Sequence, residues 1–106
     1  MYGTIFRLQP KAGRDADVVT LMQEWNRQRG ATVPGAQATY LLRSERRPGE
    51  LIGVAVFADE PTYRANAAAP EQDAWYRRLR AVLAADPVWE DGEYLMATQF
   101  PARAGV

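Results

Sequence analysis

The segment from Leu51 to Phe57 has the sequence LIGVAVF, and it constrains the fold more than any other part of the chain. Successive side chains of a β-strand point to opposite faces of the sheet, so a strand with one face in water alternates apolar and polar residues. This segment offers no polar face. It therefore predicts a central strand whose two faces are both covered.

Three other segments have strand patterns. The turn Arg46-Arg47-Pro48-Gly49 joins one of them to Leu51–Phe57, which predicts an antiparallel hairpin. A second turn, Asp91-Gly92, precedes the segment nearest the C-terminus, where Tyr94, Met96, Thr98 and Phe100 alternate with smaller or polar residues. The predicted strands are Tyr2–Leu8, Ala36–Glu45 and Glu93–Phe100.

Helical spacing of apolar residues marks the segments between the strands. Val18, Leu21, Met22 and Trp25 form one stripe, which predicts a helix of about four turns from Asp15 to a cap at Gly30. A short helix is expected over Tyr63–Ala69, with Asp59 as its cap and Pro61 at an early position. A second helix begins at Pro70, carries Trp75, Leu79 and Val82 on its apolar face, and stops before Asp86-Pro87.

The order strand, helix, strand, strand, helix, strand predicts an α+β fold, a ferredoxin-like β-α-β-β-α-β sandwich with an antiparallel sheet and both helices on one face. The 106 residues fit a single domain, expected over residues 1–100, followed by a loose tail over 101–106. Because the strands offer no clear polar face, a second copy of the sheet is expected to cover the far side, which gives a homodimer.

Composition excludes several classes of function. The chain has no cysteine and no histidine, so it lacks a thiolate nucleophile, a zinc ribbon, the usual haem ligand and a Ser-His-Asp triad. Its net charge is zero, which argues against nucleic-acid binding, and Arg77, Arg78 and Arg80 are interpreted as a solvated helix face. The sequence contains neither a signal peptide nor an apolar run long enough to cross a membrane, so a cytoplasmic protein is expected.

The segment from Phe57 to Trp75 resembles the antibiotic biosynthesis monooxygenase (ABM) superfamily of dimeric α+β barrels, as does the order of the elements. In that family an aromatic residue ends the third strand, an acidic or small residue begins a helix, and a second aromatic follows six residues after the first. Phe57, Asp59-Glu60 and Tyr63 fit this arrangement. Lys11-Ala12-Gly13-Arg14 and Val33-Pro34-Gly35 are similar to turns of the family.

The resemblance implies a pocket between the sheet and the helices of each monomer. It also implies oxidation of a phenolic or quinol-like aromatic by molecular oxygen, with no metal and no other cofactor. Other members of the superfamily degrade haem, with a Trp on the short helix and an iron-binding His on the long one. Those positions are Asn66 and Tyr76 here, so the resemblance to the haem-degrading branch lacks its axial ligand, and only a tyrosinate from Tyr76 remains.

Two residues are candidates for catalysis. The Asn66 amide would hydrogen-bond a substrate oxygen, and the alternative is a cap at the end of a helix. Arg7 would hold a substrate anion if it faces inward, and the alternative is a surface salt bridge. The substrate-binding candidates are aromatic, with packing in the core or at an interface as the alternative: Trp25, Trp75, Tyr76, Tyr63 and Phe57.

Three further residues are less decisive. Tyr40 and Arg43 lie on opposite faces of their strand, so at most one of them can point toward a given pocket. Trp89 is placed in the loop before the last strand and is expected to pack at the dimer interface.

Three functions remain open from the sequence. The first is a cofactor-independent monooxygenase acting on a phenolic or quinol-like aromatic. The second is a non-catalytic dimeric module that binds a small apolar or aromatic ligand or has a structural role. The third is a lyase, isomerase or cyclase on the same scaffold, because a fold does not fix a function.

Overall fold

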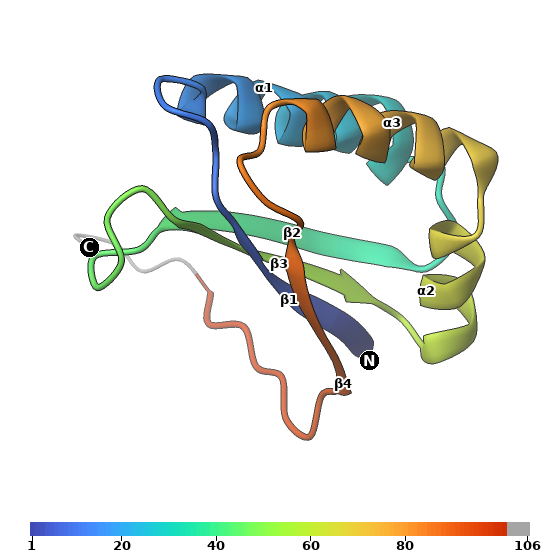
Figure 1. Cartoon of the computed structure of the whole chain (residues 1–106). Coiled ribbons are helices and arrows are strands. Elements are labelled where there is room, and N and C mark those ends of the chain that lie inside the picture. Colours follow the sequence, from blue (N-terminus) through green and yellow to red (C-terminus); the bar gives the residue numbers. More distant parts are fainter. Residues whose placement is uncertain (102–106) are drawn as a thin grey trace.

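The computed structural model describes residues 1–101, and it has the predicted ferredoxin-like α+β fold (Figure 1). Its four-stranded antiparallel sheet has the order β2-β3-β1-β4, so β3 and β1 are the central strands. The elements, in chain order, are β1 (Tyr2–Leu8), α1 (Asp15–Trp25), a π-helical turn (Asn26–Gly30), β2 (Ala36–Arg43), β3 (Leu51–Phe57), α2 (Glu60–Ala67), α3 (Pro70–Ala81) and β4 (Val88–Glu93).

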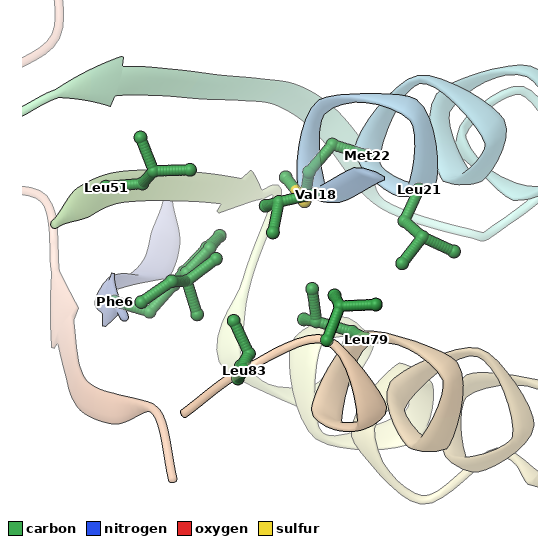
Figure 2. Close-up of a cluster of buried hydrophobic side chains, with 9 residues drawn as sticks. Phe6, Val18, Leu21, Met22, Leu51, Leu79 and Leu83 are labelled. Carbon is green, nitrogen blue, oxygen red and sulfur yellow. The ribbon is translucent and has the colours of Figure 1, made fainter. Parts of the chain in front are cut away.

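Helices α1 and α3 lie side by side over one face of the sheet, and α2 lies near one end of it (Figure 1). Their apolar stripes meet the sheet in a core that includes the fully buried Leu8, Val18, Leu79 and Leu83. Figure 2 shows how Phe6 and Leu51 point from the strands toward the side chains of the two helices. The predicted apolar stripes therefore form the core.

Strand register decides which side chains reach the helices. Thr4, Phe6 and Leu8 are buried on the helix face of β1, whereas Ile5 and Arg7 between them are exposed on the other face. The central position predicted for Leu51–Phe57 is confirmed, because β3 pairs with β1 on one side and with β2 on the other.

Gly53 of β3 lies opposite Phe6 of β1 in the register. A Cβ atom at this position would overlap the Phe6 ring, which covers the glycine. The absence of a side chain at Gly53 therefore allows a large ring to lie flat on the helix face of the sheet.

The short helix α2 begins as the sequence indicates. The Asp59 side chain accepts a hydrogen bond of 2.9 Å from the Thr62 backbone N–H, and Pro61 occupies the first turn. This contact lowers the pKa of Asp59, because the hydrogen bonds from the Thr62 backbone and side chain favour the ionised carboxylate. The helix starts at Glu60, directly after the predicted cap, and ends at Ala67, two residues before the expected Ala69.

The prediction of the last strand was wrong. Strand β4 spans Val88–Glu93 and includes the Asp91-Gly92 pair that had been interpreted as a turn. Its partner β1 begins at Tyr2, which lies opposite Glu93, and only one further backbone hydrogen bond follows, from Tyr94 N–H to the Met1 carbonyl. Within residues 1–101, the alternating residues after Glu93 therefore have no neighbouring strand, and Leu95 and Met96 are exposed.

The face of the sheet away from the helices is apolar and open to solvent in the single chain. Four large apolar side chains on it are between 46% and 60% exposed, namely Ile5, Tyr40, Leu42 and Val88. They come from β1, β2 and β4, and the exposed Arg7 lies on the same face, between Val88 and β3 in the register. We call these four residues the outer face.

Three predicted features complete the description. The helix expected over Asp15–Gly30 is present, but its last turn, Asn26–Gly30, is π-helical. Across residues 1–101, no helix is both long and apolar enough to cross a membrane. The tail predicted over 101–106 lies outside the described residues, apart from Pro101.

Candidate functional site

A cavity of about 250 Å³ lies between the sheet and the helices. Seven aromatic residues contribute to its wall, and they come from β1, α1, β3, α2, α3 and β4: Phe6, Trp25, Phe57, Tyr63, Trp75, Tyr76 and Trp89. Ligand cavities are typically concave, mostly apolar and equipped with a few polar groups. This cavity has that character, and its position is the one that the family resemblance implies.

The indole N–H groups of two tryptophans are already used by the protein. Trp25 Nε1 donates to Gln72 Oε1 at 2.7 Å, and Trp75 Nε1 donates to the Leu21 carbonyl at 2.9 Å. Trp25 is buried at the end of α1, where its ring belongs both to the apolar stripe and to the cavity wall. Both tryptophans therefore contribute apolar ring surface to the cavity.

Trp89 is a cavity residue that the sequence reasoning misplaced. It lies in β4 rather than in a loop, and its ring centroid is 5.0 Å from that of Phe6 and 6.4 Å from that of Tyr76. The two residues share a face because Phe6 and Trp89 are opposite each other in the β1–β4 register. A strand beginning at Val88 would have predicted this position, since Trp89 and Asp91 then alternate with Val88 and Glu90.

Asn66 lies on α2, borders the cavity and is half-buried. Its Oδ1 accepts a hydrogen bond of 2.9 Å from Arg29 Nη2, and Arg29 belongs to the π-helical turn after α1. A guanidinium group has only donors, so this contact fixes which atom of the amide faces Arg29. The Asn66 side chain is thus oriented by the π-helical turn although it is carried by α2.

Tyr63 precedes Asn66 by one helical turn and also borders the cavity. Its ring lies 5.5 Å from that of Phe57 and 5.4 Å from that of Tyr2, measured between centroids. Its hydroxyl donates to Asp91 Oδ1 at 2.9 Å. Burial, and next the hydrogen bond to Asp91, raises the pKa of Tyr63 to about 12, so the phenol stays protonated at neutral pH.

Arg64 completes this polar group. Its guanidinium donates to Asp91 Oδ2 at 3.1 Å and to the Tyr2 hydroxyl at 2.9 Å. Partial burial alone would raise the pKa of Asp91, but hydrogen bonds from Thr4, Tyr63 and Arg64, together with the charge of Arg64, hold the pKa below its usual value. Asp91 is therefore an ionised carboxylate with one oxygen toward Tyr63 and the other toward Arg64.

Not every candidate from the sequence lies at the cavity. Trp25, Phe57, Tyr63, Asn66, Trp75 and Tyr76 contribute to its wall, whereas Arg7 is exposed on the opposite face of β1. Tyr40 belongs to the outer face, and Arg43 lies 3.6 Å from Asp15 in an exposed ion pair. In the described part of the chain, no group of three or more His, Cys, Asp or Glu side chains is placed to hold a metal ion.

Sequence reasoning also missed Gln72 and Thr4, which border the cavity. Gln72 lies in the first turn of α3, where a glutamine resembles a surface residue, and its partner Trp25 is 47 positions away. Thr4 is 3% exposed, and its hydroxyl donates to the Glu90 carbonyl at 3.2 Å. A polar residue between buried positions of a central strand was the one available signal for Thr4.

Comparison with known proteins gives a consistent result. Residues 1–78 match the family described as antibiotic biosynthesis monooxygenase. None of the curated proteins matches the chain.

Solved structures share the fold. SnoaB, a cofactor-independent oxygenase from Streptomyces nogalater, is 18% identical with a TM-score of 0.76, and the alignment covers 91% of this chain and 94% of that one. NE2512, a protein of unknown function from Nitrosomonas europaea, is 22% identical with a TM-score of 0.74, over 96% of this chain and 95% of that one. Rv0793 from Mycobacterium tuberculosis is 13% identical with a TM-score of 0.76, over 92% and 98% of the two chains.

Proposed function

The chain belongs to the antibiotic biosynthesis monooxygenase family, and from this premise we propose that it oxidises a phenolic or quinol-like aromatic compound with molecular oxygen. The observation that carries the proposal is the aromatic cavity with the Asn66 amide in its wall. A flat, electron-rich ring would pack against the tryptophan and phenylalanine rings. SnoaB, which has the same fold, is a cofactor-independent oxygenase.

The proposed chemistry needs little from the protein beyond binding and electrostatics. A phenolate or enolate can itself reduce oxygen, so the site has to bind the substrate, exclude water and stabilise the anion. For an anthrone, a ring CH₂ group becomes a carbonyl: one atom of O₂ enters the product, the other leaves as water, and the substrate supplies all four electrons. We assign the contact to the substrate oxyanion to Asn66 and give Arg7 no role in it, because Arg7 lies on the other face of the sheet.

Oxygen uptake with a panel of anthrones and naphthoquinols tests this proposal. We expect consumption of both oxygen and substrate, and a loss of about tenfold to a hundredfold in kcat/KM for Asn66→Ala, since an amide donor to a developing anion contributes at most a few kcal/mol. Gln23→Ala, which removes an exposed amide from α1, is the matched control and should keep the activity. If no compound is consumed and Asn66→Ala has no effect on ligand binding either, the protein is a non-catalytic module.

We also propose that the protein is a homodimer joined through the outer face. The family resemblance implies a dimeric α+β barrel, and four large apolar side chains on three strands supply a surface suited to a second sheet.

A further inference from the structure

We propose that Tyr63 is a hydrogen-bond acceptor for a hydroxyl group of the ligand, held in that role by Asp91 and Arg64, while Gln72 joins Asn66 as a donor to a ligand oxygen. The inference rests on the proposed function only in taking the aromatic cavity as the ligand site. The inference says which residues of the cavity wall donate hydrogen bonds to the ligand and which accept them. These directions determine whether the ligand needs a hydroxyl group or a carbonyl or phenolate oxygen at each position.

The role of Tyr63 follows from the chemistry of its partner. An ionised carboxylate can only accept, so the Tyr63 hydroxyl must donate its single proton to Asp91 Oδ1 at 2.9 Å. The low pKa of Asp91 keeps that carboxylate ionised at neutral pH, and Arg64 occupies the second carboxylate oxygen at 3.1 Å. What remains on the Tyr63 oxygen is lone-pair density, which accepts a hydrogen bond from a ligand O–H.

The side-chain amides of Asn66 and Gln72 donate hydrogen bonds to the ligand, whereas Tyr63 accepts one. Trp25 Nε1 can only donate, so its 2.7 Å contact fixes Gln72 Oε1 toward the indole and leaves the Gln72 NH₂ group free to donate. Arg29 likewise can only donate, so its contact with Asn66 Oδ1 leaves the Asn66 NH₂ group free. Both orientations follow because the Trp25 indole and the Arg29 guanidinium have only hydrogen-bond donors.

A ligand that satisfies this wall has a defined chemistry. It is a flat aromatic compound with a hydroxyl group for Tyr63 and a carbonyl or phenolate oxygen for the amides. The cavity volume of about 250 Å³ is at the lower end for ligand sites, which favours a compound of two or three fused rings. Trp25 and Trp75 cannot compete for these polar groups, because their N–H groups are occupied by the protein.

Hydroxytetralones, their methyl ethers, tetralone itself and hydroxytetralin are suitable probes, since they separate the hydroxyl from the carbonyl on one bicyclic frame. All three tryptophans of the chain border the cavity, so quenching of their fluorescence reports binding, and calorimetry gives the Kd independently. We expect the best hydroxytetralone to bind the wild-type protein about three- to tenfold more tightly than its methyl ether, the worth of one hydrogen bond. Loss of the carbonyl should weaken binding by a similar factor.

Tyr63→Phe removes the accepting oxygen and keeps the ring that packs on Phe57 and Tyr2. In this variant the ratio of the Kd of the methyl ether to the Kd of the hydroxytetralone should fall to the value that the extra methyl group alone causes. Tetralone should bind to the variant as tightly as to the wild type. Tyr2→Phe is the matched control, because it removes a hydroxyl from the same polar group that does not border the cavity, and its ratio should stay at the wild-type value. Gln72→Leu should weaken the ketones and spare hydroxytetralin.

Asp91→Asn gives a sharper test of Asp91 as a positioning residue. Arg64, which can only donate, would take the single amide oxygen, so the amide NH₂ group would face Tyr63 and donate to it. The Tyr63 proton would then turn toward the cavity, where the hydroxyl compound and the methyl ether can both accept it, so the preference for the hydroxyl compound should be lost. A merely structural role for Asp91 would weaken all probes equally and leave the ratio unchanged.

The outcomes separate this inference from the proposed function. If the probes bind but the ratio is the same in the wild type and Tyr63→Phe, the assigned direction is wrong and the oxygenase proposal stands. If the ratios change as expected but no compound consumes oxygen, the direction is supported and the oxygenase proposal fails. If none of the probes binds, both are overturned, because the cavity is then not an aromatic ligand site.

Discussion

Phe6 and Gly53 form a pair whose effect reaches the cavity. The Phe6 ring covers the glycine on β3, and on its other side it lies 5.0 Å from the Trp89 ring. Trp89 in turn lies 6.4 Å from Tyr76, so a row of aromatic rings runs from β1 through β4 to α3. The absence of a side chain at Gly53 therefore determines how close the Phe6 ring, which forms part of the cavity wall, lies to the sheet.

Gly53→Ala should destabilise the protein by about 1–3 kcal/mol, because the new methyl group would overlap the Phe6 ring in a packed core. Urea denaturation followed by circular dichroism measures this change. Gly92→Ala on β4 is the matched control, since nothing lies within 4 Å of the added methyl group, and it should be neutral or slightly stabilising. Equal stability of the two variants would contradict the assigned packing of Phe6.

The ionisation of Asp91 gives a pH dependence with a defined sign. Its folded-state pKa lies below the unfolded value, so its contribution to stability is present above the unfolded pKa and is lost as the pH falls through the folded value. The wild type should therefore be more stable than Asp91→Asn at neutral pH. The difference should shrink as the pH falls below about 4, where a free aspartate begins to be protonated. Urea titrations of both proteins at several pH values measure it, and a difference that does not change with pH would contradict the interpretation.

At the scale of elements, α2 carries Tyr63 and Asn66 although it has only eight residues and no buried one. Helices of this length are not stable alone, because too few hydrogen bonds offset the cost of nucleation. Its stability depends on the Asp59 cap, on Pro61 in its first turn and on the contacts of Tyr63, Arg64 and Asn66 with β4 and the π-helical turn. The cap thus holds two residues of the cavity wall in place.

Asp59→Ala should lower the free energy of unfolding by about 1 kcal/mol and increase hydrogen exchange of the α2 amides. Asp59→Asn retains an oxygen that can accept from the Thr62 N–H, so it should lose much less. We also expect weaker ligand binding in Asp59→Ala, since Tyr63 and Asn66 are less firmly placed. Unchanged exchange in α2 would show that the cap does not hold this helix.

Much of the fold could be predicted from local patterns. The apolar run of β3 and the stripes of α1 and α3 depend on residues close in sequence, and these elements lie where expected. The bounds of β4 depend on where β1 begins, because Tyr2 is the last strand residue available for pairing. The alternation after Glu93 is present in the sequence, but it has no partner strand in the part of the chain that the structure describes, so the local pattern predicted a wrong strand.

The same distinction applies to the site. The aromatic wall could be predicted because tryptophan, tyrosine and phenylalanine on apolar stripes must pack somewhere, and the resemblance placed a cavity between sheet and helices. The hydrogen bonds that orient Asn66, Gln72 and Tyr63 join residues 28 to 47 positions apart. No spacing rule within one element predicts such pairs, and this is why Gln72 and Asp91 were missed.

At the scale of the whole molecule, the sheet is covered by helices on one side only. The outer face combines apolar side chains of β1, β2 and β4, and the exposed Leu95 and Met96 follow β4 on the C-terminal segment, which lies below the sheet (Figure 1). Soluble monomers rarely expose this many large apolar side chains on one face of a sheet. A second copy of the sheet would remove it from water and leave the helices of both copies outside.

Leu42→Glu should convert the proposed dimer to a monomer at micromolar concentration, because it places a charge within the apolar contact. Light scattering after size-exclusion chromatography measures this, with a mass of about two chains expected for the wild type. Val19→Glu is the control, since Val19 is an exposed apolar residue on α1 away from the outer face, and it should remain dimeric. A wild-type protein that elutes with the mass of one chain would refute the dimer.

The π-helical turn at Asn26–Gly30 changes the directions in which the side chains after Trp25 point from the helix axis. A π turn contains more residues than an α turn, so each side chain after Trp25 lags behind the position that an unbroken α-helix would give it. That lag sets the direction in which Arg29 leaves the helix, and Arg29 is the group that orients the Asn66 amide. Residues 26–30 therefore set the direction of the Arg29 side chain. Deletion of one residue there would rotate the Arg29 guanidinium away from Asn66 and free the Asn66 amide, although no residue that contacts the ligand is changed.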